Sequence, residues 1–199
     1  EVVPALRQHE DDPTVRGLDA HLGALYGSEH PYGRPVKGSV NGVARVTRDD
    51  LVTLHAERFV PSALTAVLVG DVEPSHAIAV ATEVFGRWSG PPVRRVALPA
   101  PTGRTKRRDI VIPMPGKSQA AVAYGFVPTQ RRDPTYYACS LMNNILGQYA
   151  MGGRLGDSIR EKQGMAYYCS SAFDAGLIEG PLVIRAGVAA ENVERVIRS

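Results

Sequence analysis

Residues 152–167 read GGRLGDSIREKQGMAY, and this stretch decides how the chain is interpreted. Two glycines precede a short polar helix, in which Leu155 and Ile159 are four positions apart and share one buried face. Charged residues crowd the last turn of that helix, and Gly164 suits the left-handed conformation that ends a helix. The run 165–173 is rich in aromatic and small residues and predicts a strand.

The predicted helix and strand place Arg160 and Tyr167 close together, on either side of the Gly164 turn. Spacing alone favours a structural interpretation, in which Arg160 caps the helix and Tyr167 packs in the core. A functional interpretation of this pair depends on a resemblance to a known family.

The run Arg-Glu-Lys-Gln-Gly-Met-Ala-Tyr (160–167), after Gly-Gly-Arg-Leu (152–155), resembles the second domain of insulinase/pitrilysin-type zinc metallopeptidases. The mitochondrial processing peptidases and their bacterial relatives belong to that family. Three further runs are similar to the family's first domain and follow in the expected order: HPYGRP (30–35), TRDDL (47–51) and VGDV (69–72). The resemblance covers nearly the whole chain.

The resemblance implies a role for Arg160 and Tyr167, which match a family pair in type and in their seven-residue spacing. In the family, that pair holds the substrate backbone at the scissile bond. Two bowl-shaped halves close around an unfolded peptide or small protein, with zinc on one half and the Arg–Tyr pair on the other. A guanidinium offers several donors and a phenol one directional donor, which suits both to peptide carbonyls and to an oxyanion.

The zinc-binding motif of the family is missing from this sequence. A zinc peptidase of this kind carries His-x-x-Glu-His on a helix, with two His as ligands and the Glu as general base. The histidines here are at positions 9, 21, 30, 55 and 76, and no two are four residues apart. We therefore expect no metal ligand and no catalytic residue on this chain, and no activity from the chain alone. His30 is isolated and is expected to support the fold.

Secondary-structure patterns on the two sides of a proline-rich span predict the domain organisation. Residues 1–90 read as helices with N-caps at Asp12 and Thr47, a buried strand at 64–69 and a further helix at 73–88. Pro13 is expected in the first turn of the helix that Asp12 caps. The expected core face of the 73–88 helix consists of Ile78, Val84, Phe85 and Trp88. Residues 91–108 hold four prolines and read as a linker.

After the linker, strands are predicted at 110–112, 120–126 and 182–184, with helices after Asp133 and after Glu191. Together with the resemblance, these patterns predict an α+β chain of two metallopeptidase-type pseudo-repeat domains, whose antiparallel sheets are flanked by helices. Residues 1–90 are the C-terminal part of the first insulinase-type domain and residues 109–199 the N-terminal part of the second. Both domains are expected to be incomplete.

Composition excludes several classes of protein. The net charge is +3, and the basic residues are too scattered to indicate a nucleic-acid partner. No apolar run approaches the 18 residues that a membrane span needs. The first residues show no signal-peptide pattern, and the two cysteines, at 139 and 169, make no disulfide framework. A cytoplasmic location is the expectation.

Two functions remain open at this point. In one, the chain is part of a zinc-dependent endopeptidase, and it supplies the substrate-binding Arg–Tyr half of the active site. Zinc is then held upstream in the complete enzyme or by a partner subunit. In the other, the chain belongs to a non-catalytic subunit that binds peptide or scaffolds a processing-peptidase-like complex. Both allow a homo- or heterodimer with a subunit that bears His-x-x-Glu-His, and the encoded sequence before Glu1 discriminates between them.

Overall fold

The computed structural model describes residues 2–93, 97–101, 106–149 and 152–199. Contacts group the chain into one unit made of residues 1–40 and 98–199 and a second unit made of residues 41–97. The predicted division at the linker 91–108 separates two pseudo-repeat domains of the family that the sequence resembles. The two units described here are instead defined by the contacts within the structure. That division stays a prediction, and parts of the linker (94–96 and 102–105) lie outside the described residues.

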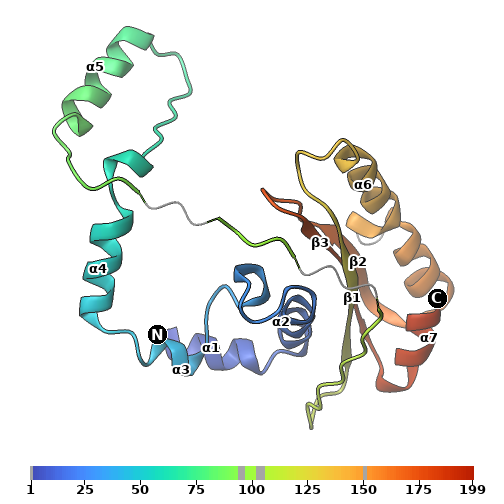
Figure 1. The fold of residues 1–199 in the computed structure, drawn as a ribbon. Coiled ribbons are helices and arrows are strands. Elements are labelled where there is room, and N and C mark those ends of the chain that lie inside the picture. Colours follow the sequence, from blue (N-terminus) through green and yellow to red (C-terminus); the bar gives the residue numbers. More distant parts are fainter. Residues whose placement is uncertain (1, 94–96, 102–105, 150–151) are drawn as a thin grey trace. The chain divides into compact units, whose positions relative to one another are not determined.

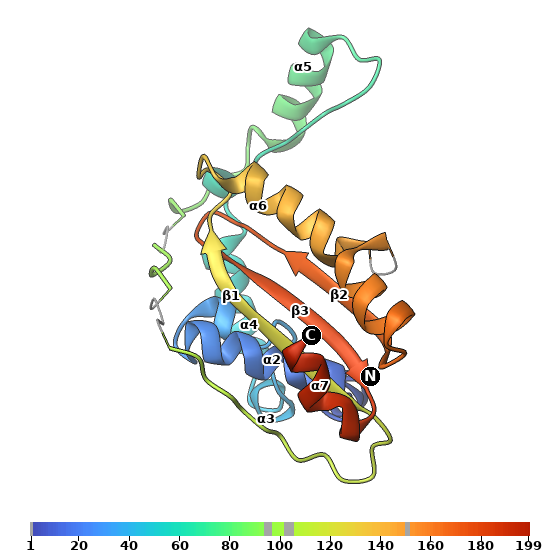
Figure 2. The same ribbon diagram turned by 90° about the vertical axis from the view of Figure 1, so that its right-hand side faces the viewer.

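The first unit is built on an antiparallel sheet with helices on both faces (Figures 1 and 2). Its strands are β1 (Ala120–Thr129), β2 (Ala166–Phe173) and β3 (Gly180–Val188), in the spatial order β1-β3-β2. Its helical segments are α1 (Val2–Glu10), α2 (Pro13–Tyr26), η1 (Pro31–Gly33), α6 (Tyr136–Asn143), η3 (Asn144–Gln148), η5 (Gly156–Lys162), η6 (Ala190–Asn192) and α7 (Val193–Arg198). Among these, η3 and η5 are wound as π-helices. The predicted α+β class with an antiparallel sheet flanked by helices is confirmed.

The core of this unit lies between the sheet and the helices that follow β1 in the sequence. Helix α2 packs on one face of the sheet, while α6, η5 and α7 lie on the other (Figures 1 and 2). The buried cluster on the η5 face consists of Ile159, Met165, Ala166, Cys169, Ala186, Val188 and Val196. Leu155 packs against it, which confirms the predicted buried face of Leu155 and Ile159.

Local capping signals in the sequence hold in the structure. The Asp12 carboxylate accepts hydrogen bonds from the backbone N–H groups of Thr14 and Val15, at 2.8 and 3.4 Å. Pro13 is the first residue of α2, where its missing N–H costs nothing. Both features match the prediction.

His30 supports the fold, as predicted. It is 4% exposed, and its ring stacks on Tyr26 at 5.0 Å between centroids. Nδ1 accepts a hydrogen bond from the backbone N–H of Tyr32, so Nε2 carries the proton and donates to the Pro99 carbonyl oxygen, with both distances at 3.0 Å. Both ring nitrogens are therefore used within the fold.

The second unit consists of helices and extended chain. Its helical segments are α3 (Val40–Val43), whose first residue is grouped with the first unit, α4 (Arg48–Arg58), η2 (Pro61–Ala63) and α5 (Pro74–Phe85). Thr47 caps α4 as predicted, because its hydroxyl accepts from the Asp50 N–H while the Asp50 carboxylate accepts from the Thr47 N–H. This reciprocal pair is a capping box.

Several predictions of strand and core are wrong. The run 64–69 is not a strand, and Val67 and Val69 are 79% and 92% exposed; 110–112 is not a strand either. A strand forms only beside a hydrogen-bonding neighbour, and within the described residues neither run has one. The residues predicted as the core face of the second-unit helix are exposed: Ile78, Val84, Phe85 and Trp88. No helix in the described parts of the chain is long and apolar enough to cross a membrane.

We expect His21 to make the stability of the first unit depend on pH. Its Nε2 is buried on α2 with no hydrogen-bond partner within the described structure, and burial lowers the pKa of the imidazole. Unfolded His21 takes up a proton near pH 6.5, whereas the folded form resists it. The unfolded state then binds more protons, so the free energy of unfolding falls as the pH drops below about 6.5.

Denaturant unfolding at pH 7.5 and 5.5 measures this dependence. His21→Leu should lose part of the pH dependence, and His76→Gln, at an exposed position on α5, should keep all of it. An unchanged pH dependence in His21→Leu contradicts the expectation.

Candidate functional site

The candidate site is the turn that joins η5 to β2. Gly164 has φ +61°, in the left-handed region, and ends the helix as predicted. The Gly164 N–H donates to the Arg160 carbonyl at 2.9 Å, and the Met165 N–H donates to the Ile159 carbonyl at 3.0 Å. In the Schellman motif that ends an α-helix, the two corresponding hydrogen bonds span three and five residues. Here they span four and six residues, one more each, because η5 is wound as a π-helix. These two hydrogen bonds tie the start of the turn back to the last turn of η5.

We expect Gly164→Ala to lower the free energy of unfolding by about 1 kcal/mol, because a Cβ is strained in the left-handed region. Gly152→Ala is the matched control, since a Cβ there meets no atom within 4 Å and its φ lies outside that region. Denaturant unfolding of both variants measures the difference. Equal losses would mean that Gly164 does not hold the turn.

A β-bulge follows the turn at the start of β2. Ala166 pairs with Val188 and Tyr168 pairs with Gly187, so two residues of β2, Tyr167 and Tyr168, lie opposite one residue of β3. The extra residue of a bulge is left out of the ladder, and its side chain is turned to a new direction. Tyr167 occupies this place.

The structure brings Arg160 and Tyr167 together at the protein surface. The guanidinium carbon of Arg160 lies 5.9 Å from the centroid of the Tyr167 ring, within cation–π range. Tyr167 is 76% exposed, so the structural interpretation that buries it in the core is wrong for this residue. The Arg160 side chain is 37% exposed, and its Nε lies 3.7 Å from the Glu161 carboxylate. Both polar groups can therefore reach a ligand outside the fold.

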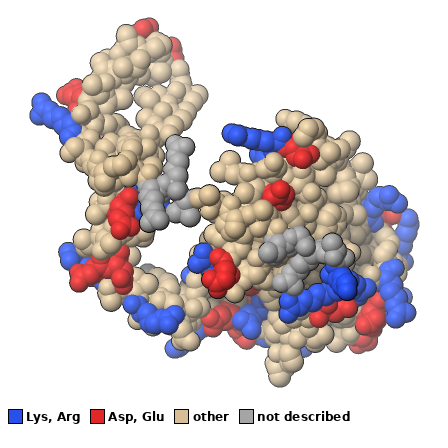
Figure 3. Space-filling view, viewed as in Figure 1, with Lys and Arg blue, Asp and Glu red and all other residues tan. Residues whose placement is uncertain are grey.

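The surroundings of the pair carry charges of both signs. Lys162 Nζ donates to Asp157 Oδ2 at 2.6 Å within η5. On the face of the molecule shown in Figure 3, Lys and Arg side chains lie interspersed with Asp and Glu. That distribution agrees with the small net charge, and the expected lack of a nucleic-acid partner stays a prediction.

The described residues do not fit a zinc ion. Within the ranges that the structure describes, no three His, Cys, Asp or Glu side chains gather as metal ligands would. His30 has both ring nitrogens hydrogen-bonded within the fold. Ligands for a metal would have to come from outside these residues.

Sequence reasoning missed three residues that surround the bulge. Tyr168 reaches from β2 to Thr14 at the start of α2, with 3.1 Å between the two hydroxyl oxygens, and its ring covers Gly187 of β3. The adjacent aromatic residues Tyr167 and Tyr168 were the available signal. A regular strand puts neighbouring side chains on opposite faces, and this alternation accounts for two adjacent tyrosines without a bulge. The sequence pattern therefore gives no sign that an extra residue is inserted there.

Comparisons with known proteins identify the family and the fold. A family model described as "Peptidase M16 inactive domain" matches residues 45–199. An uncharacterized zinc protease of Mycobacterium tuberculosis is 30% identical over 198 residues, which are 99% of this chain and 45% of that protein. The crystal structure of a peptidase M16 inactive domain from Pseudomonas fluorescens matches with a TM-score of 0.84 and 27% identity, over 99% of this chain and 47% of that one.

A chain of complex III from Candida albicans matches with a TM-score of 0.72 and 14% identity, over 96% of this chain and 46% of that one, which shows the fold alone. The chain spans about half the length of the curated relatives that it matches. The resemblance found in the sequence is confirmed. Because the model of the peptidase M16 inactive domain matches most of this chain, the chain belongs to the peptidase M16 (insulinase) family.

Proposed function

We propose that this chain supplies the substrate-binding Arg–Tyr half of the active site of a zinc-dependent endopeptidase. The observation that carries the proposal is the pairing of Arg160 with the exposed Tyr167 beside the Gly164 turn, where the guanidinium carbon lies 5.9 Å from the centroid of the ring. The substrate is an unfolded peptide or a small protein in an extended conformation.

The chemistry of the pair suits the peptide backbone. Arg160 remains charged at any physiological pH and offers a planar fork of donors, while the Tyr167 hydroxyl offers one directional donor. An extended peptide presents carbonyl oxygens as acceptors along its length, without regard to sequence. Donors aimed at a carbonyl also stabilise the negative charge that grows on its oxygen when the bond is attacked.

Zinc belongs to the complete protein in this proposal, because the relatives are named zinc proteases and the described residues here do not fit the ion. We place its ligands on an upstream segment or on a partner subunit that bears His-x-x-Glu-His, in a homo- or heterodimer. Residues 1–90 and 109–199 then belong to two pseudo-repeat domains, both incomplete in this chain. A cytoplasmic location is also proposed, from the sequence alone.

Peptide binding tests the proposal without any cleavage. Fluorescence anisotropy with a labelled unfolded peptide should show that Arg160→Ala raises Kd about tenfold or more, because a hydrogen bond to a charged group contributes about 1.5–3 kcal/mol. Arg154→Ala removes the same charge from an exposed position six residues earlier and should leave Kd unchanged. Equal Kd values for the two variants contradict the proposal.

A non-catalytic, peptide-binding or scaffolding subunit is the second candidate. The family model that matches is described as an inactive domain, which favours it. This candidate predicts the same peptide binding through Arg160 but no cleavage by the complete protein. A His-x-x-Glu-His motif in the encoded sequence before Glu1, together with cleavage of the peptide, would decide for the endopeptidase.

A further inference from the structure

The bulge in β2 changes which face of the sheet each side chain occupies. In a regular strand, residues two apart share a face, so Ala166 and Tyr168 would lie together. Instead, Ala166 and Cys169 are both buried in the cluster on the η5 face, while Tyr168 bonds to Thr14 of α2 on the opposite face. The alternation is therefore reset by one extra residue, and that residue is Tyr167.

The position of Tyr167 depends on this extra residue. A residue that directly follows Ala166 in a regular strand points to the α2 face, away from η5 and Arg160. Tyr167 can meet the Arg160 guanidinium only while the bulge persists. Whatever holds the bulge therefore also holds the candidate substrate-binding pair.

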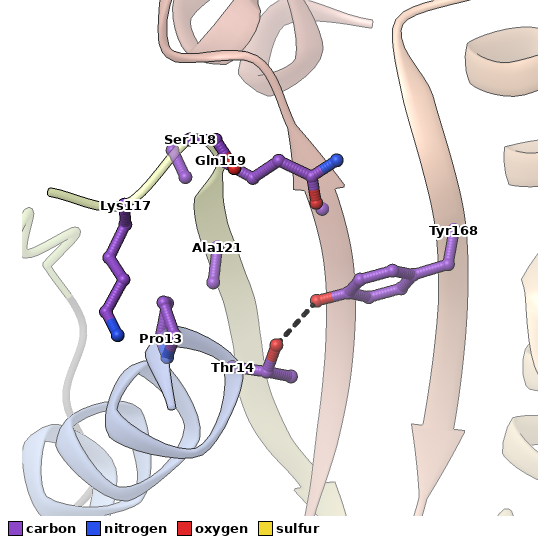
Figure 4. A pocket seen from close by; sticks show the side chains of 9 residues that line it. Pro13, Thr14, Lys117, Ser118, Gln119, Ala121 and Tyr168 are labelled. Atoms are coloured by element: carbon purple, nitrogen blue, oxygen red, sulfur yellow. Dashed lines mark hydrogen bonds between the residues drawn. The ribbon is translucent and has the colours of Figure 1, made fainter. Parts of the chain in front are cut away.

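Tyr168 is fixed at both ends of its side chain. Its hydroxyl oxygen lies 3.1 Å from Thr14 Oγ1, in the first turn of α2, and Figure 4 shows the ring reaching toward that helix. The ring lies over Gly187, where an added Cβ would come within 2.4 Å of Tyr168 Cε1. Real Cβ atoms do not approach carbon so closely, so glycine at position 187 is what admits the ring.

We infer that Gly187, Tyr168 and Thr14 position Tyr167 against Arg160 by holding the β2 bulge in place. Gly187 is the residue that the two bulged residues face, and Tyr168 is the second of those two. A ring held over Gly187 and tied to α2 keeps Tyr168 on the α2 face, which forces the extra residue outward. None of the three is a catalytic residue, and the inference rests on the proposed substrate-binding role of Tyr167.

Fluorine NMR of the chain labelled with 3-fluorotyrosine reads the position of Tyr167 directly. Tyr167→Phe assigns its resonance, and Arg160→Ala shows how far that resonance moves when the guanidinium is lost. We expect Gly187→Ala to move it in the same direction, and Thr14→Val and Tyr168→Phe to move it less, since each removes only the hydroxyl bond. Thr14→Val keeps the shape of the side chain, so it remains informative if Gly187→Ala does not fold.

Two control variants separate positioning from general damage to the fold. Tyr26→Phe removes another long-range tyrosine hydrogen bond in the same unit, from its hydroxyl to the Glu179 carbonyl at 3.0 Å. Gly17→Ala adds a methyl group that meets only Ala121 Cβ, at 4.0 Å. Neither should move the Tyr167 resonance. A Tyr167 resonance that stays fixed in folded Gly187→Ala and Thr14→Val overturns the inference.

Cleavage by the complete protein gives the second readout. Gly187→Ala should lower kcat/KM about tenfold, and Gly17→Ala should leave it unchanged. If the Tyr167 resonance moves in Gly187→Ala while Arg160→Ala cleaves normally, the positioning stands and the proposed role of the pair in substrate binding fails. The two failures are thereby distinguished.

Discussion

Replacing Arg160 by Ala in the complete protein is expected to lower kcat/KM for peptide cleavage by roughly a hundred- to a thousandfold, with the melting temperature nearly unchanged. Losing one donor to a developing oxyanion costs about 2.7–4 kcal/mol. The stability cost should be small, because the ion pair of Arg160 is a 3.7 Å contact with its exposed neighbour Glu161. Tyr167→Phe should act in the same way, since the ring is mostly exposed and only the hydroxyl is removed.

The conservative variant Arg160→Lys discriminates between charge and geometry. A lysine keeps the charge but cannot reproduce the planar fork of donors, so we expect poor rescue of cleavage. Steady-state kinetics and thermal unfolding on the same preparations provide both readouts. A structural role for the pair predicts the opposite pattern, in which stability is lost and activity per folded molecule is preserved.

The isolated chain of residues 1–199 should bind no stoichiometric zinc and cleave no peptide. The sequence has no two histidines four residues apart, and the described residues gather no set of metal ligands. The effect is large, because cleavage is expected to be absent rather than reduced. Elemental analysis of the purified chain and a peptide-cleavage assay measure it.

Its control is the complete protein, or the isolated chain mixed with a subunit that bears His-x-x-Glu-His, in which cleavage should be restored. One tightly bound zinc per isolated chain would show that a ligand set exists within these residues. Cleavage by the isolated chain, abolished by a chelator, would show the same.

Local features of the fold could be predicted because they depend on neighbouring residues alone. The caps at Asp12 and Thr47 and the stop at Gly164 each rest on a hydrogen bond or a backbone angle within a few residues. Burial depends on distant segments instead. The apolar run 64–69 has strong strand propensity, yet within the described residues it has no neighbour to pair with.

The candidate site divides in the same way. The closeness of Arg160 and Tyr167 could be predicted, because a helix, a glycine stop and a strand follow one another in the sequence. In the structure the guanidinium carbon of Arg160 lies 5.9 Å from the centroid of the Tyr167 ring. The exposure of Tyr167 does not follow, because it depends on a bulge opposite Gly187, a residue twenty positions away. A one-residue change in register reverses the face of a strand side chain, so sequence patterns cannot fix it.

The most direct test of the central claim is the turnover of a double variant, Arg160→Ala with Tyr167→Phe, in the complete protein. The claim that this pair binds the substrate backbone predicts a stably folded protein. Its kcat/KM should be no higher than that of the less active of the two single variants. Normal turnover by a stably folded double variant would remove the functional role of the pair altogether.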